Sequence, residues 1–145
     1  MKSLAIFFLL AVLGGPGAAQ DGGLLKIVVL EGEGAFNNIK KRVGRDPVVE
    51  VRDENDHPVA GAKVMFALPP DGASGTFTGG GKTFNIVTDE RGRGATKGMK
   101  PNSTEGRFKI KVIASAAGKV GSAFVSQSNT LAGGAIAIGR KGPGE

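Results

Sequence analysis

The chain has 145 residues, of which 25 are glycine, and it contains no cysteine, tryptophan or tyrosine. Its formal net charge is +6, and 40% of its residues are hydrophobic, enough for one modest core. This composition excludes a disulfide scaffold and a collagen-like fibre, because the glycines have no three-residue period. The 8 phenylalanines are the only aromatic residues, so the basic balance does not by itself predict nucleic-acid binding.

Residues 1–19 have the layout of a cleaved secretory signal peptide. Lys2 supplies a positive start, and an apolar run and a Gly-Gly-Pro break follow it. The apolar run is shorter than the about 20 residues that a transmembrane helix needs. We expect cleavage between Ala19 and Gln20, with 20–23 as a short lead-in. The mature chain should then be secreted, periplasmic or in the cell envelope, without a stable membrane span.

Short strands separated by turn residues are predicted along residues 24–127. The first, LLKIVVL (24–30), is an apolar run typical of a strand buried on both faces. The polar stretch after it is expected to be a connection with one helical turn at most, at 35–39. Further strands are predicted at 47–53, 62–68, 76–78, 82–89, 95–96, 107–115 and 119–127. Because no amphipathic helix is predicted, the pattern favours an all-β, antiparallel β-sandwich.

Alternation along these strands predicts which side chains face the core. The inward positions are Val49, Val51, Val64, Phe66, Leu68, Phe84 and Ile86. Arg107, Lys109 and Lys111 alternate with apolar residues, so they are expected to form the solvated face of a strand. Residues 128–145 are predicted to be a flexible, glycine-rich tail, since the apolar run within them is too short to span a membrane.

The sequence GGGKT, residues 79–83, looks like the end of a phosphate-binding loop. That motif requires an earlier glycine at the position where this chain has Thr76. It also requires a helix after the lysine, whereas TFNIVTD has the period of a strand. We therefore predict a hairpin turn, in which Lys82 is dispensable for stability.

The stretch DENDHP, residues 53–58, concentrates carboxylates and the only histidine of the chain. Asp53, Asp56 and Asp89 are weak candidates for a calcium site, although their spacing is not that of an EF-hand. His57 alone does not make a zinc site, because zinc needs three or four protein ligands. No serine stands in a nucleophile motif, so no catalytic residue, metal or cofactor is assigned and the chain is not expected to be an enzyme.

Several segments, in order, resemble the bacterial immunoglobulin-like domain of the invasin/intimin type. They are VEVRDENDHPVAGAKVMFALP, GTFTGG, VTDERGRGAT and EGRFKIKVIAS. The residues that carry the resemblance are Asp53, Pro58, Gly61, Val64, Phe66, Asp89, Gly92, Gly94 and Phe108. Two positions depart from the family pattern: Phe108 replaces the commoner tyrosine, and Asp56 stands where a turn glycine is usual. Aspartate tolerates the left-handed region better than most residues, so the turn is expected to survive.

The resemblance implies one immunoglobulin-like antiparallel β-sandwich of about seven strands over residues 24–127. It also implies a non-catalytic, adhesion-like or spacer-like role toward a protein or carbohydrate of the cell envelope, without nucleic acid. An alternative is an accessory module similar to the transthyretin-like or carboxypeptidase-regulatory sandwiches, which assists envelope transport or an enzyme. Both kinds of module share the pattern of an Asp turn followed by Pro-Val-x-Gly.

Overall fold

The structure, a computed structural model, describes residues 23–131, and these residues form an all-β fold. Ten strands, β4 to β13, make three sheets, and the described chain has no α-helix. One short 3-10 turn, Thr78–Gly80, is present. The predicted signal peptide with its cleavage site at Ala19 and Gln20 lies outside the described residues, as does the tail from residue 132 onward.

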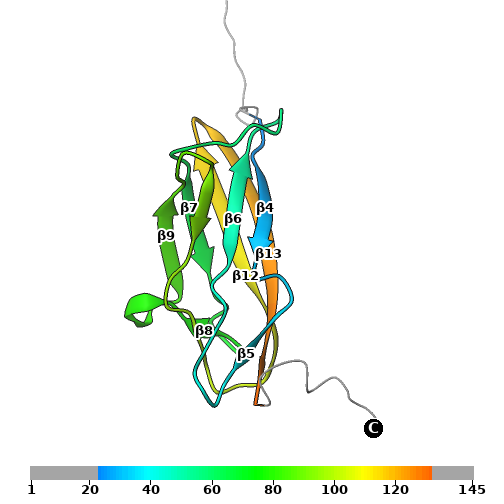
Figure 1. Ribbon diagram of the computed structural model, residues 1–145, viewed down its shortest axis with the longest axis vertical. Coiled ribbons are helices and arrows are strands. Elements are labelled where there is room, and N and C mark those ends of the chain that lie inside the picture. Colours follow the sequence, from blue (N-terminus) through cyan, green and yellow to red (C-terminus); the bar gives the residue numbers. More distant parts are fainter. Residues whose placement is uncertain (1–22, 132–145) are drawn as a thin grey trace, which may run out of the picture.

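The largest sheet has the strand order β5-β13-β12-β7-β9. Its strands are β5 (Ala35–Asn38), β7 (Lys63–Ala67), β9 (Thr83–Val87), β12 (Gly106–Ala116) and β13 (Lys119–Thr130). The second sheet, of order β10-β6-β4, contains β10 (Arg93–Ala95), β6 (Val48–Arg52) and β4 (Lys26–Glu31). A short third sheet pairs β11 (Lys100–Pro101) with β8 (Gly75–Thr76). The long β12–β13 hairpin runs along the molecule, and β5 and β8 lie near one end of it (Figure 1).

One hydrophobic core lies between the two larger sheets, and residues from both sheets contribute to it. Val49 and Val51 of β6 are fully buried, and so are Phe66 of β7 and Ile110 of β12. Burying a side chain of this size contributes about 1.5–3 kcal/mol. The predicted inward faces are therefore confirmed for these strands. The predicted solvated face of β12 is confirmed as well, since its alternate basic residues are exposed.

The connection after the first strand differs from the prediction of one helical turn, and that prediction is wrong. Residues 35–38 form β5, which pairs in parallel with β13 from Ala35↔Gln127 to Asn38↔Thr130. The predicted sandwich was antiparallel throughout, so this pair corrects it. AFNN has no strand alternation of its own, and its extended form depends on a partner about ninety residues away.

Polar residues at this end of β13 are buried rather than solvated. Asn37, Gln127 and Asn129, here called the amide cluster, are each at most 1% exposed. Asn37 Nδ2 donates to Gln127 Oε1 at 3.0 Å and to Asn129 Oδ1 at 3.2 Å. Because these side chains are satisfied inside the fold, β13 continues to Thr130, three residues into the predicted tail.

The predicted first strand also differs from the expectation of burial on both faces. β4 contributes Ile27 and Val29 to the edge of the core, but Leu30 is 38% exposed. The strand lies at the edge of the three-stranded sheet and carries an irregularity between Val29 and Glu31. An edge strand has one neighbour in its sheet, so part of an apolar run remains at the surface.

The GGGKT segment is a turn that leads into strand β9, but the predicted hairpin is wrong, because β8 pairs with β11 and β9 pairs with β7 in a different sheet. The 3-10 turn at Thr78–Gly80 precedes β9, and no helix follows Lys82. However, Lys82 Nζ donates to Gly75 O at 3.0 Å and to Ser74 Oγ at 3.3 Å. These contacts tie Lys82 to the segment at β8, and its dispensability for stability stays a prediction.

Candidate functional site

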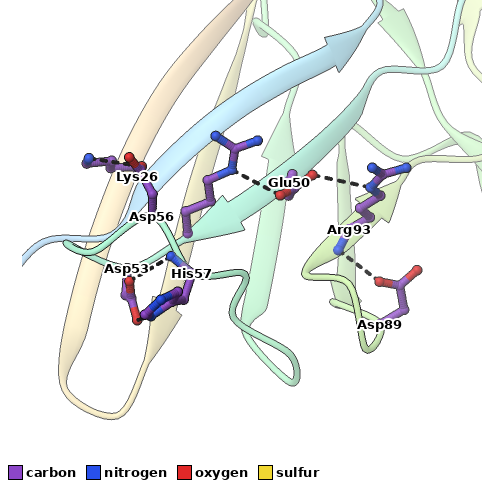
Figure 2. Close-up of polar contacts among 8 residues, drawn as sticks. Lys26, Glu50, Asp53, Asp56, His57, Asp89 and Arg93 are labelled. Carbon is purple, nitrogen blue, oxygen red and sulfur yellow. Dashed lines mark hydrogen bonds and ion pairs between the residues drawn. The ribbon is translucent and has the colours of Figure 1, made fainter.

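Two turns of the same geometry begin at Asp53 and Asp89 (Figure 2). In each, the carboxylate Oδ1 accepts backbone N–H groups from two and four residues later, at 2.8 and 3.0 Å. These hydrogen bonds, above all those from the N–H groups of His57 and Arg93, hold the pKa of both carboxyls below the usual range. Each aspartate therefore serves first as an acceptor that closes its own turn.

The fourth residue of each turn is left-handed, with φ of 65° at Asp56 and 77° at Gly92. The expectation that the turn forms with Asp56 in the left-handed region is thus confirmed. Asp56 also pairs with Lys26 at 3.1 Å (Figure 2). At Gly92 a residue with a side chain does not fit, because a Cβ there would lie 2.7 Å from the carbonyl oxygen of Val51.

The calcium candidates are not brought together as a ligand set. Within residues 23–131 no group of three or more histidine, cysteine or acidic side chains is placed to hold a metal ion. Asp53 and Asp89 direct an oxygen to backbone amides of separate turns, and Asp56 pairs with Lys26. This geometry gives the calcium hypothesis no support.

The residues that could take part in acid–base chemistry lie apart. His57 is exposed and its Nδ1 lies 3.8 Å from Asp53 Oδ2, in the turn after β6. Ser74 lies in the loop before β8, and its hydroxyl donates to Pro69 O at 2.7 Å. A histidine acts as a general base only within reach of its nucleophile, and these two contacts are both local.

The charged groups on the outward face of the three-stranded sheet are engaged in ion pairs with one another. Glu50 is only 6% exposed and lies between two guanidinium groups (Figure 2). It accepts from Arg52 Nε at 3.0 Å and from Arg93 Nε at 3.3 Å. The hydrogen bond from Arg52 is the main reason that the pKa of Glu50 is low, and burial opposes the shift. Glu50, Arg52 and Arg93 are therefore bound to one another on this face.

The outward face of the five-stranded sheet is different. Lys63 of β7 and Arg107, Lys109 and Lys111 of β12 are exposed there, and we call this surface the basic face. In the described part of the chain, none of the four has a carboxylate oxygen within 4.0 Å. Lys109 Nζ lies 5.5 Å from the ring centroid of Phe124, which is 55% exposed. These cations remain available to a partner.

Strand β13 adds a second row of side chains to the basic face. The register places Ser128 opposite Arg107, Ser126 opposite Lys109, and Phe124 opposite Lys111. Alternation in the sequence identified the cations but not this row, because pairing partners come from the sheet register. The alternation of serines and a phenylalanine along 122–128 was the available signal.

Three open hollows mark the same side of the sheet. One, of about 520 Å³, is lined by residues of β7, β9 and β12 that include Lys63, Met65 and Ile113. A second, of about 440 Å³, includes Lys111 and Ser122. The third, of about 190 Å³, is lined by Glu33, Gly34, Phe36, Arg107, Ser126, Gln127 and Ser128. The basic face is therefore uneven and offers both polar and apolar contacts.

Comparison of this chain with protein-family models, with curated proteins and with solved structures finds no match. Within residues 23–131, no helix has the length and apolar character needed to cross a membrane. Any assignment of function therefore depends on the geometry of the described residues.

Proposed function

We propose that this chain is an exported, immunoglobulin-like module of the cell envelope or its surroundings that acts by binding and not by catalysis. The observation that carries the proposal is the basic face. Four exposed cations from β7 and β12 share one side of the sheet without a carboxylate partner among the described residues. An unneutralised surface attracts a partner of opposite charge and speeds its association.

The strand order supports the immunoglobulin-like part of the proposal. With the short β5, β8 and β11 left aside, β4, β6 and β10 lie in one sheet, and β7, β9, β12 and β13 in the other. In chain order this is the division of strands A, B and E from C, C′, F and G in immunoglobulin-like domains. The paired aspartate turns at Asp53 and Asp89 are consistent with the resemblance noted in the sequence.

The binding role is supported by the way the charged residues are distributed. Carboxylates near the aspartate turns and on β6 are engaged by backbone amides or arginines. The cations of β12 are not engaged in this way. Fold alone does not define function, so the proposal depends on this surface.

A capture experiment tests the proposed function. The chain from Gln20 onward is immobilised and incubated with envelope fractions of the source organism, and retained material is identified. A variant with Arg107, Lys109 and Lys111 changed to threonine should lose most of the retained material. Threonine suits an exposed strand position, so the variant should fold.

A matched control removes the same charge elsewhere. Lys40, Lys41 and Lys97 are exposed in loops, and their side chains have no ion pair within the described residues. Changing these three to threonine should leave capture unchanged. Equal capture by all three proteins, or none by any of them, would contradict the proposed function.

A further inference from the structure

We propose that the basic face binds a linear, acidic polysaccharide, an inference that rests on the binding role proposed above. The row Arg107, Lys109, Lys111 supplies the contacts to its acidic groups. The row Phe124, Ser126, Ser128 on β13 supplies contacts to the sugar rings and their hydroxyls. Lys63 and the hollow beside it extend the site toward β9.

The spacing of the cations fits an extended polymer. Alternate residues on one strand lie about 6.7 Å apart, so Arg107, Lys109 and Lys111 form a line of roughly 13 Å. All three point to the same side of the sheet and are exposed. A small anion would contact one of them, whereas a chain with repeated carboxylates can contact them in succession.

The second row supplies what a sugar needs besides charge. Ser126 and Ser128 lie directly opposite Lys109 and Arg107 in the register, at distances of about 5 Å between Cβ atoms. A serine hydroxyl both donates and accepts hydrogen bonds, which matches the hydroxyls of a sugar. Phe124 is 55% exposed, and the part of its ring that Lys109 does not cover can contact the apolar face of a pyranose.

The absence of internal pairing among the described residues distinguishes this surface from the outward face of the three-stranded sheet. On that sheet, Glu50 forms ion pairs with both Arg52 and Arg93. Near the basic face, Glu33 lines the hollow that contains Arg107, and its Oε1 accepts the N–H of Ser126 at 3.1 Å. Glu33 forms no ion pair with a cation of the basic face, so Arg107 keeps its donors free for a partner.

The other polyanions fit this surface less well. Single-stranded nucleic acid is usually held by aromatic rings that stack on successive bases. Here the exposed rings near the basic face are Phe36 and Phe124, on different strands. A membrane surface is usually bound by apolar side chains that enter it. Val87, Val120 and Phe124 are exposed on this side of the sheet, but the residues opposite Arg107 and Lys109 are serines, which suit a sugar better.

The test uses the chain from Gln20 onward and sodium polygalacturonate, a linear polymer with one carboxylate per sugar. Its fully methyl-esterified form is the matched neutral probe, because the sugar chain is the same and the charge is gone. Binding is measured by biolayer interferometry. The chain should bind the acid form, bind the ester at least tenfold more weakly, and lose affinity as salt rises from about 0.05 to about 0.5 M.

Substitutions test whether the polysaccharide binds at the basic face. Changing Arg107, Lys109 and Lys111 to threonine should weaken binding on the order of tenfold or more. Phe124→Ser should weaken it less, about threefold, with little change in salt dependence. The control that changes Lys40, Lys41 and Lys97 should bind like the unaltered chain. Equal weakening by the two triple variants would overturn the proposal, because only net charge would then matter.

Two further probes separate the glycan from other partners. Tighter binding to single-stranded poly(dT), or to vesicles with anionic phosphatidylglycerol, would overturn the assignment of a polysaccharide. Failure with polygalacturonate, combined with capture from envelope fractions that still requires the basic face, would overturn this inference and leave the proposed function intact. Failure of both would remove the proposed function as well.

Discussion

The two ends of the molecule are closed by different chemistry. At one end, Asp53 and Asp89 each close a turn by accepting two backbone N–H groups on one carboxylate oxygen. At the other end, the amide cluster joins β5 to β13 through buried, neutral side chains. Its members also donate to loop carbonyls, as Asn129 Nδ2 does to Ser74 O at 2.7 Å.

The two ends differ in how far apart in the sequence the joined residues are, and in whether the joining side chains are charged. An aspartate turn spans five residues, so its geometry is local and its stabilising effect depends on the ionised carboxylate. The amide cluster joins residues about ninety positions apart, and its side chains do not titrate. Loss of one of its members leaves several buried polar groups without partners. The two ends should therefore respond differently to substitution and to pH.

The largest effect is expected from Asn129→Ala. The change removes three hydrogen bonds donated by Nδ2, to Ser74 O, Asn102 Oδ1 and Thr104 O, and leaves their acceptors without this donor. We expect a loss of about 3 kcal/mol in the free energy of unfolding. Urea unfolding followed by circular dichroism measures it.

Its control is Ser128→Ala, the neighbouring position, which points outward on the same strand. This change should alter stability by about 0.5 kcal/mol at most. If both variants were equally stable, the amide cluster would not be what closes this end.

At the aspartate end, Gly92→Ala is the most damaging simple change. Gly92 has a φ of 77°, and a Cβ would lie 2.7 Å from Val51 O and 2.9 Å from Val59 N. We expect a loss of about 2–3 kcal/mol, from left-handed strain together with the clash. Thermal unfolding of the purified chain gives the value.

Gly61→Ala measures the cost of left-handed backbone strain without a steric clash. Gly61 has a φ of 75°, but a Cβ added there would meet no atom within 4 Å, so the loss should be about 1 kcal/mol. A Gly92 variant no less stable than the Gly61 variant would show that the turn can move away from β6.

The smallest effect is a dependence of stability on pH that belongs to the aspartate end. The folded-state pKa of Asp53 and of Asp89 is lowered, chiefly by backbone hydrogen bonds. Their contribution is therefore complete above the unfolded pKa of about 4 and is lost as the pH falls through the lower folded pKa. Urea midpoints measured between about pH 7 and pH 2.5 should fall most steeply in the acid range.

The double change of Asp53 and Asp89 to asparagine should flatten this profile. An asparagine oxygen can still accept the amide hydrogens, but it does not titrate in this range. Asn129→Ala should lower the whole curve without changing its shape. An unchanged acid slope in the double variant would assign the pH dependence to other carboxylates, such as Glu50.

Local patterns predicted the aspartate end well and the amide end poorly. The turn at Asp53 was recognisable from residue types alone, and so was the left-handed role of Asp56. Strand β5 was missed, because AFNN has neither alternation nor a run of strand formers in sequence order. Asn129 was assigned to a tail, since a buried asparagine is indistinguishable from a solvated one until its partners are known.

The candidate site was predicted only in part. Alternation correctly placed Arg107, Lys109 and Lys111 on an outward face of β12. It did not reveal that Phe124 and two serines lie opposite them, because the register with β13 decides that. Nor did it reveal that Glu50 would pair with the two arginines of the other sheet, while these cations have no carboxylate partner within the described residues.

The sequence by itself determined where the chain turns and which side of most strands faces inward. The turns and the inward faces both depend on residues close together in the sequence. Glycine, proline and aspartate favour turns, and side chains alternate with a period of two along a strand. Only the tertiary structure decided which strands pair, which polar groups are buried and which cations remain unneutralised. These properties depend on distances between residues far apart in the chain, and no local pattern encodes such distances.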